Sequence, residues 1–532
     1  MFALAALTGP LPKAGVVVVA ALAATALLVR DDRRRAVAML GALVLAPFLL
    51  IADIWHSPQL HFVPRHPVLA VGLVLIALAA VAALAIVFDR WPAALGALAL
   101  AALPFRVSIQ SGGVTNNLLV PLYFVIGAGS LAFAVRTLRA EEPRSQEHGP
   151  GWLERLLALL IVLYAVQALY SPTAVAPGSV SGFEQALKNM VFFYVPFTLL
   201  YCLLARLKWT PELIRNCVRL VAVLAIALAG VAFVEYATRT TYFSSRLGQT
   251  NQLYDYFVAN SVFFDPNIFG RFLALAMVAL ATLLLYDRPG RDQLAATGVL
   301  AVLWAALVIS FSRSSMVALL VGLALLAAMR WRPRAALVTG TAVLVVGAAA
   351  VAISPTTFGF NQGLNGVSAG RGSVLSGGLK LFGDRPAWGF GSGSFEAEYR
   401  AHNLGTGTLT ASHTTPVTVA AEQGVVGELV YVALVVVAIG TLGRGAREDP
   451  LRAAIAAAFA ALLVHTMLYA DFLEDPFTWA LLGVGAALAR ASPTGAVRPV
   501  YGSNSVSSIP SRAGSASGAA ARASATRPST LS

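Results

Sequence analysis

Charged residues and cysteines are scarce in this sequence. Asp, Glu, Lys and Arg make up 12% of its 532 residues, whereas a typical soluble domain carries roughly 25%. The two cysteines, Cys202 and Cys217, are too few to form a disulfide framework or a cysteine-rich metal site. These shortages argue against a soluble enzyme and against a fold held together by disulfides.

Hydrophobic residues, in contrast, account for 58% of the chain. They recur in runs whose length suits a membrane helix, which needs about 20 apolar residues. We therefore predict an all-α, polytopic membrane helix bundle of about 13–15 spans with one long extracytoplasmic loop. The apolar runs lie at 13–29, 36–53, 67–87, 92–104, 118–135, 153–170, 187–205, 213–236, 262–285, 294–311, 315–329, 335–353, 415–441, 453–469 and 477–489.

The basic residues indicate how these helices are oriented. The net charge is +13, and the arginines gather in every second predicted loop, beginning with the basic block at residues 30–35. Cytoplasmic loops of membrane proteins are enriched in Lys and Arg. We therefore predict an integral protein of the cytoplasmic (inner) membrane, with its N-terminus outside and its C-terminus in the cytoplasm. The orientation of the protein in the lipid bilayer then explains its positive net charge, and we expect no nucleic acid as a partner.

The pattern divides the chain into three predicted parts. Residues 1–259 hold N-terminal membrane helices, and residues 260–490 form a second membrane domain that includes a long outer loop at 354–414. Loops of this length are usually functional or disordered, and aromatic residues such as Trp388 and Tyr399 favour an ordered, functional loop. Residues 491–532 are rich in Ser, Ala, Gly and Arg and contain no acidic residue, so we predict a disordered cytoplasmic tail.

Two arginines stand at the predicted outer ends of helices. Arg271 follows Asp265-Pro266-Asn267, a segment typical of a helix start, and so lies about one turn inside an apolar helix. An ionisable residue there is a functional candidate, and the alternative is an ion pair with a nearby acid such as Asp265 or Glu235. Arg313 lies in a short polar link between two apolar runs, where it either binds a substrate or simply reaches the membrane surface.

The long loop and the helix after it supply further candidates. Arg371 opens the second half of the loop, and a glycine-rich run with Gly389 and Gly391 follows it. The run superficially resembles a phosphate cradle, although a structural turn is the simpler interpretation. His413 lies at the expected outer end of a helix, nine residues before Glu422. By itself His413 is either an interface histidine or a base.

The order of these residues along the chain is informative. Ser312-Arg313 between two helices is followed by Arg371, by a Gly-x-Gly-x-Gly run, and by His413 with Glu422 nine residues later. In this order, and with Asp265-Pro266-Asn267 before it, the sequence resembles the bacterial O-antigen ligase and O-antigen polymerase family over roughly residues 260–490.

The sequence departs from the pattern of this family at two places. Thr414 stands where the family usually has Asn after the histidine, and no Trp follows Arg371 closely. His402-Asn403 carries the literal pair, but no Glu or Gly follows it at the right spacing. We therefore keep His413 as the match and His402 as the lesser candidate.

The resemblance implies a membrane-embedded glycosyltransferase of the GT-C class that needs no metal or other cofactor. Members of the family transfer a glycan from undecaprenyl pyrophosphate to an acceptor on the outer side of the cytoplasmic membrane. The resemblance implies His413 as general base, with Arg313 and Arg371 as the other catalytic residues. The substrate-binding residues would be Arg271, Asn267, Gly389, Gly391 and Glu422.

Other interpretations remain open from the sequence. The acceptor is a glycolipid in a ligase and another carrier-linked glycan in a polymerase. A lipid-glycan flippase or transporter is the alternative from another class, but the sequence lacks the internal repeats typical of transporters. A related type of polymerase relies on an acidic residue in the outer loop, and Glu396 or Glu398 could supply one here. Asp471, Glu474 and Asp475 could bind a cation, but a solvated turn is the favoured interpretation.

Overall fold

The computed structural model describes residues 10–54, 62–111, 114–140, 149–173, 180–252, 256–286, 290–331, 371–405 and 411–491. The predicted tail at 492–532, the apolar run at 335–353 and the first part of the outer loop lie outside the described residues.

The described chain is helical almost throughout, which confirms the predicted all-α membrane fold. Its first half comprises α1 (Pro10–Leu28), α2 (Asp32–Ile54), α3 (Phe62–Arg65), α4 (Pro67–Arg90), α5 (Pro92–Ala102), α6 (Val120–Arg139), α7 (Trp152–Ala168), α8 (Gly182–Asn189), the π-helical turn η2 (Met190–Tyr194), α9 (Val195–Leu204), α10 (Pro211–Thr238) and α11 (Ser245–Asn251). Its second half comprises α12 (Pro266–Tyr286), α13 (Arg291–Ile309), α14 (Arg313–Arg330), α17 (Arg371–Asp384), α18 (Phe395–Ala401), α19 (Thr415–Gly443), α20 (Pro450–Tyr469) and α21 (Pro476–Arg490).

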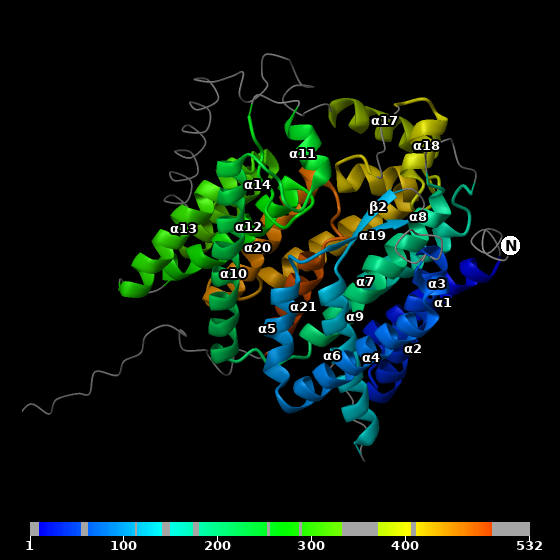
Figure 1. Cartoon of the computed structure of the whole chain (residues 1–532), viewed down its shortest axis with the longest axis horizontal. Coiled ribbons are helices and arrows are strands. Elements are labelled where there is room, and N and C mark those ends of the chain that lie inside the picture. The colour runs from blue at the N-terminus through cyan, green and yellow to red at the C-terminus, as the bar shows by residue number, and fades with distance from the viewer. Residues whose placement is uncertain are drawn as a thin grey trace, which may run out of the picture.

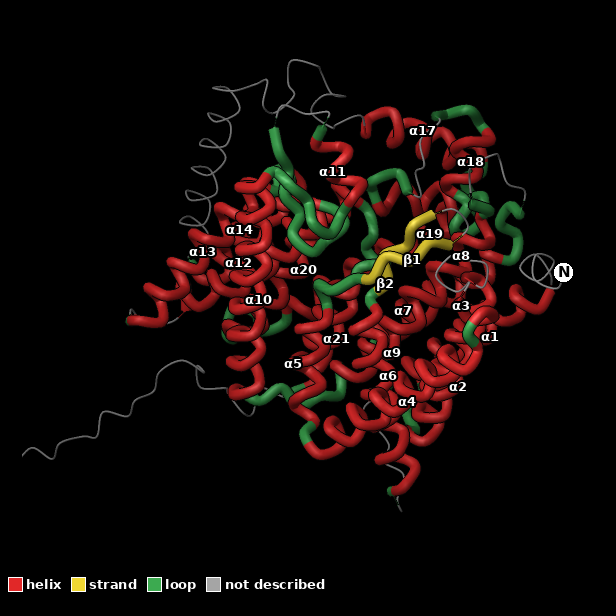
Figure 2. The backbone as a smooth tube through the Cα atoms, viewed as in Figure 1, coloured by secondary structure: helices red, strands yellow, loops and turns green. Residues whose placement is uncertain are grey.

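One small feature departs from the prediction. Two short strands, β1 (Val107–Ser111) and β2 (Val114–Leu118), pair antiparallel with Val107 opposite Leu118. Figure 2 shows this hairpin crossing one face of the helical bundle. The apolar run predicted at 118–135 therefore begins one residue after the last strand as α6.

The helices that can cross a membrane agree with the apolar pattern. Ten helical segments among the described residues are long and apolar enough to do so, and two shorter apolar helices, Pro92–Ala102 and Gln293–Ile309, accompany them. Each predicted apolar run that falls on described residues coincides with a helix. The total of 13–15 spans stays a prediction, because one of the runs is not described.

The bundle has two hydrophobic cores that meet along α20. One core joins α1, α2, α6, α7 and α9 to α19 and α21, and the other joins α10, α12, α13 and α14. Phe459 of α20 belongs to the first core and Leu462 to the second. In Figure 1 the helices α19–α21 accordingly lie between the early helices and α10–α14. The boundary predicted at residue 260 stays a prediction, and contacts such as those of α7 with α19 cross it.

Small residues set the spacing of α12, α14 and α20. A Cβ atom on Gly270 would lie 2.6 Å from Ser315 Oγ, and one on Gly322 would lie 2.6 Å from a methyl of Val278. Glycine at such positions lets membrane helices approach closely. The close approach at Gly270 brings the short polar link before α14 directly against the start of α12.

A break in α19 anchors the second half of the outer loop. Gly424 interrupts the helix with φ 65° and ψ −165°, and a Cβ atom there would lie 2.4 Å from Ala387 O. The segment after α17 pairs with this break, since Val425 N donates to Pro386 O at 2.7 Å and Gly391 N donates to Glu422 O at 2.8 Å. The break therefore seats the glycine-rich run inside the protein.

Gly424→Ala should destabilise the protein by about 1–3 kcal/mol, because it forces an L-residue into a strained backbone conformation against the Ala387 carbonyl. Gly440→Ala on the same helix is the matched control, since a Cβ atom there meets nothing within 4 Å. Melting of both variants in detergent measures the difference, and equal melting temperatures would contradict the packing described for the break.

Candidate functional site

Tyr469, the last residue of α20, is surrounded by four nitrogen-bearing side chains. The guanidinium groups of Arg271 and Arg371 lie 5.6 Å and 5.8 Å from its ring centre. The rings of His413 and His465 lie 6.2 Å and 5.7 Å from it. Three predicted site residues from α12, α17 and the start of α19 are thus brought to one place, which we call the Tyr469 cluster.

Arg271 forms the buried base of this cluster. Its side chain is 1% exposed, forms an ion pair with Asp475 and donates from Nε to His465 Nδ1 at 3.1 Å. His465 Nε2 in turn lies 3.0 Å from Ser315 Oγ. The alternative ion-pair interpretation therefore holds for Arg271, with Asp475 in the place of Asp265. The guanidinium is thus engaged within the protein, and its assignment as a substrate-binding residue stays a prediction.

Asn267 links the starts of α12 and α14. Its backbone N–H and side-chain amide donate to Asp265 Oδ1 at 2.7 Å and 3.0 Å, which caps α12. Its side-chain oxygen accepts from Ser312 Oγ at 3.0 Å. Ser312 also caps α14 by accepting from Ser315 N. The predicted substrate-binding amide of Asn267 is thus engaged in joining two helix ends.

Arg313 and Arg371 lie on the open side of the cluster. Arg313 is exposed at the first residue of α14, and Arg371 donates from Nη1 to Leu468 O at 2.5 Å. Burial lowers the pKa of Arg371, Tyr469 and Asp265 oppose this effect, and the charge of Arg313 lowers the pKa further. Because Arg313 and Arg371 carry like charges, an anion between them would be stabilised.

His413 lies beside these arginines just before α19. Its backbone has φ 60°, a strained conformation for a non-glycine residue that is typical of functional sites. Partial burial lowers its pKa, the charge of Arg371 lowers it further, and the carboxylate of Asp265 opposes both effects. The imidazole is consequently neutral at neutral pH and able to accept a proton.

Helix ends add to the positive potential around Tyr469. The helices α12, α14, α17, α19 and α21 all begin at or beside residues of the cluster. The N-terminal end of a helix carries a partial positive charge and unpaired backbone N–H groups. One helix, α20, ends at Tyr469 and brings the opposite partial charge, and Arg371 satisfies its Leu468 carbonyl. The more numerous helix starts favour an anionic group at this end of the bundle.

Glu422, Gly389 and Gly391 have a different role in the structure. The carboxylate of Glu422 accepts from Gly393 N at 2.8 Å and from Phe395 N at 3.1 Å. Gly389 N donates to Arg385 O, and Gly391 N donates to Glu422 O. These bonds hold the loop against the break in α19, as the simpler interpretation of the glycine-rich run predicts. Their assignment as substrate-binding residues stays a prediction.

His402 lies at the end of α18 among other residues. Its Nδ1 lies 3.5 Å from a carboxylate oxygen of Glu398, and its ring lies 5.5 Å from that of Phe390. These contacts belong to the outer loop and its helices rather than to the Tyr469 cluster. Of the two histidines considered, His413 is the one placed with the arginines.

The acidic turn between α20 and α21 was misjudged from the sequence. Asp475 is 1% exposed, and Glu474 Oε1 accepts from Asn189 Nδ2 at 2.9 Å. Burial raises the pKa of both Asp471 and Glu474. The solvated-turn interpretation is therefore wrong, because the turn folds back into the bundle, where Asp475 pairs with Arg271. Within the described ranges, no group of three or more His, Cys, Asp or Glu side chains is arranged to hold a metal ion.

Sequence reasoning also passed over His465 and Tyr469. His465 was detectable, because an ionisable residue inside an apolar helix is a functional candidate by default. Tyr469 carried no such signal, since a tyrosine at the end of a membrane helix is common at the interface.

Asp475→Ala should lower the free energy of unfolding by about 3–5 kcal/mol, because it leaves Arg271 charged, buried and unpaired. Asp449→Ala is the matched control: Asp449 also caps a helix and also precedes a proline, but its ion pair with Arg452 is partly exposed. Loss of that cap costs about 1 kcal/mol. Equal destabilisation of the two variants in detergent would contradict the role assigned to the buried pair.

Comparison with known proteins bears on the same residues. The comparison with curated proteins gives no match. Residues 298–432 match the model of a protein family described as O-antigen ligase. The matched stretch contains Arg313, Arg371, His413 and Glu422, whereas Arg271 and Tyr469 lie outside it. The resemblance drawn from the motifs is thereby confirmed over residues 298–432, the stretch of this membrane protein that matches the O-antigen ligase family model.

Proposed function

We propose that this protein transfers a glycan from undecaprenyl pyrophosphate to an acceptor hydroxyl on the outer side of the cytoplasmic membrane. The observation that carries the proposal is the placement of Arg371 and His413 beside Tyr469, with Arg313 close enough for its charge to act on Arg371. The family match supports the coarser statement, a membrane protein of the O-antigen ligase or polymerase type.

The arginines suit a pyrophosphate leaving group. Planar guanidinium groups bind phosphate oxygens in pairs and remain charged. Charge accumulates on the pyrophosphate as its bond to the sugar breaks, and groups placed in advance to stabilise that charge lower the barrier. Arg313 and Arg371 would bind the donor in this way, with helix N-termini adding to the field.

His413 suits the acceptor side of the reaction. In the proposed step, its neutral imidazole accepts the proton of the acceptor hydroxyl while that oxygen attacks the anomeric carbon. The bond from this carbon to the pyrophosphate oxygen breaks, so the configuration inverts and the pyrophosphate leaves with the electron pair. A histidine is a suitable base because its neutral imidazole is present at the working pH and can accept a proton.

The proposal includes an orientation in the membrane. The end of the bundle opposite the Tyr469 cluster is rich in arginine, including Arg490, which pairs with Glu154 and donates to Ala205 O at 3.2 Å. Because basic residues are enriched on the cytoplasmic side, this distribution supports an extracytoplasmic cluster, an outer N-terminus and a cytoplasmic C-terminus.

The same arrangement suits a polymerase, which differs in its acceptor. An O-antigen or exopolysaccharide polymerase would use another carrier-linked glycan in place of a glycolipid acceptor, with the same base and the same leaving group. Product analysis separates the two: a single transfer to a glycolipid indicates a ligase, and lengthening of a carrier-linked glycan indicates a polymerase.

His413→Ala should lower the rate of glycan transfer about 10²–10⁴-fold, the usual contribution of a general base. Arg313→Ala and Arg371→Ala should each lower it about 10²–10³-fold through lost charge stabilisation, with membrane insertion intact. Membranes containing each variant are assayed with a labelled glycan on undecaprenyl pyrophosphate. His402→Ala is the control and should transfer normally. Normal transfer by all three site variants would refute the proposal. An inactive His402 variant together with an active His413 variant would identify His402, and not His413, as the general base.

The pH dependence should follow His413. Because burial and Arg371 lower its pKa, activity should persist below pH 6.5, the ordinary pKa of histidine, and be lost only when the imidazole is protonated. Asp265→Asn keeps an oxygen that can cap α12 but removes the charge that raises this pKa, so the acid limb should move to lower pH. A pH–rate profile of both proteins tests this, and a shift to higher pH would contradict it.

A further inference from the structure

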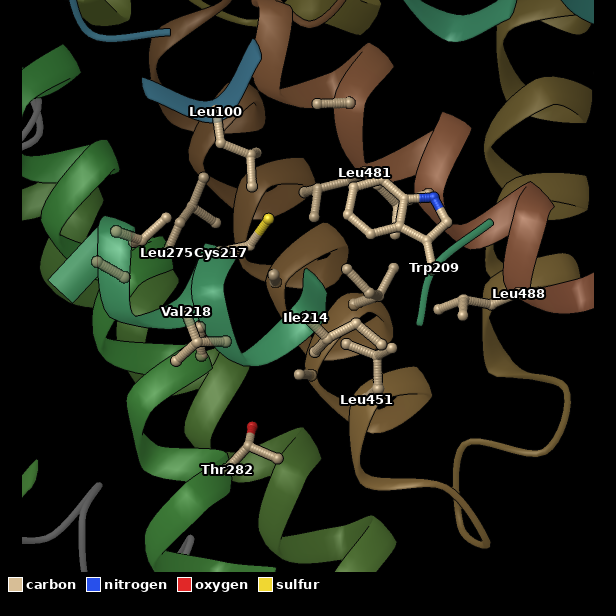
Figure 3. Close-up of a pocket in the computed structure, with 18 of the residues that line it drawn as sticks. Leu100, Trp209, Ile214, Cys217, Val218, Leu275, Thr282, Leu451, Leu481 and Leu488 are labelled. Carbon is tan, nitrogen blue, oxygen red and sulfur yellow. The ribbon is translucent and has the colours of Figure 1, made fainter. Parts of the chain in front are cut away.

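A cavity of about 220 Å³ lies between helices that are distant in sequence. Side chains of α5, α10, α12, α20 and α21 line it, among them Val218, Leu275, Leu451 and Leu481 (Figure 3). It is larger than the engineered cavity of about 150 Å³ that stays dry and binds benzene in another protein. We call this cavity the apolar slot.

The slot is elongated along the helices. On α12 its lining runs from Phe272 to Leu283, and on α21 it runs from Phe477 to Leu488. The first and last of these residues are eleven positions apart, which corresponds to about 16 Å of α-helix. This is roughly half the thickness of a bilayer hydrocarbon core. The shape suits a chain lying along the membrane normal better than a compact ligand.

The polar groups that line the slot are already bonded within the protein. The Thr282 hydroxyl donates to Val278 O at 3.0 Å, and the Trp209 indole donates to Leu204 O at 3.1 Å. The Asp449 carboxylate accepts from Leu451 N at 2.8 Å. A ligand would therefore meet hydrocarbon and satisfied groups, so recognition would depend on apolar burial alone.

One end of the slot lies directly beneath the Tyr469 cluster. Phe272 follows Arg271 in α12, and Phe477 lies two residues after Asp475 in α21. The rings of Phe272 and Phe477 are 6.1 Å apart, just below the buried ion pair. The outer end of the slot thus adjoins the buried Arg271–Asp475 pair at the base of the Tyr469 cluster, and the slot runs from there into the membrane interior.

We propose that the apolar slot holds the isoprenoid chain of the polyprenyl donor, with its phosphates at the Tyr469 cluster. This inference rests on the proposed function and adds to it the path of the lipid chain. The continuity of charge at the outer end with apolar walls below matches the chemistry of a polyprenyl phosphate, whose anionic head is joined to a single long hydrocarbon chain.

The first test narrows the slot and compares two donors. Ala279 and Ala454 line it, so Ala279→Leu and Ala454→Leu fill it without touching the charged cluster. The donors are undecaprenyl pyrophosphate and dimethylallyl pyrophosphate, whose single isoprene unit is too short to reach Ala279, bearing the same labelled glycan. The variants should lose about tenfold or more in kcat/KM for the undecaprenyl donor and change less than about twofold for the dimethylallyl donor.

Ala227→Leu, the same change at an exposed position of α10, is the matched control and should leave both donors unaffected. Equal losses with the two donors, or no loss with either, would overturn the inference.

The second test measures binding without turnover, and so separates this inference from the proposed function. Cys217 lines the slot, and Cys202→Ser leaves it as the only thiol. This protein is placed in phosphatidylcholine vesicles and labelled with N-ethylmaleimide. Undecaprenyl monophosphate should slow the labelling, whereas phosphatidylglycerol at the same mole fraction should not.

Protection by phosphatidylglycerol to the same extent would identify the slot as a general lipid site and overturn the inference. Labelling that undecaprenyl monophosphate does not slow would overturn it as well. Selective protection in a protein that transfers no glycan would uphold the slot and refute the proposed function.

Discussion

The ion pair between Arg271 and Asp475 lies almost wholly out of solvent, inside a helical bundle whose other residues are mostly apolar. A charge in such surroundings is tolerated only when a partner and hydrogen bonds satisfy it. Arg271 meets this requirement through Asp475 at the start of α21 and His465 in α20. The positions of α12, α20 and α21 are therefore coupled, and the turn that carries Asp471 and Glu474 is drawn into the bundle with them.

This coupling supports the more open residues above it. Tyr469 ends α20 within a turn of His465, and its ring lies between Arg271 on the buried side and Arg371 on the open side. The short polar link before α14 is held against Asn267, which places Arg313 near Arg371. A buried, ion-paired base thus supports the more exposed Arg313 and Arg371, and a supporting layer of this kind is what a precise binding site requires.

The helices α12 and α21, which carry the ion pair, also supply apolar side chains to the slot. In α12 the charged Arg271 is followed directly by Phe272, which lines the slot. At the start of α21, Asp475 is followed two residues later by Phe477, which also lines it. Each helix therefore changes from charged to apolar within about one turn. A lipid with an ionic head and a hydrocarbon chain has the same change of character along its length, which is why the proposed site and the slot are naturally considered together.

The sequence by itself determined the membrane fold and the apolar runs, because hydrophobic length is a local property of the chain, and the order of its motifs selected Arg313, Arg371 and His413 as candidates. It could not determine which acid pairs with Arg271, since Asp475 is 204 positions away, or that His465 and Tyr469 join the cluster. Glu422, chosen from its spacing to His413, is engaged by the amides of Gly393 and Phe395. Only tertiary packing decides such partnerships, because a buried charge or carboxylate takes the complementary group that the approach of distant helices provides.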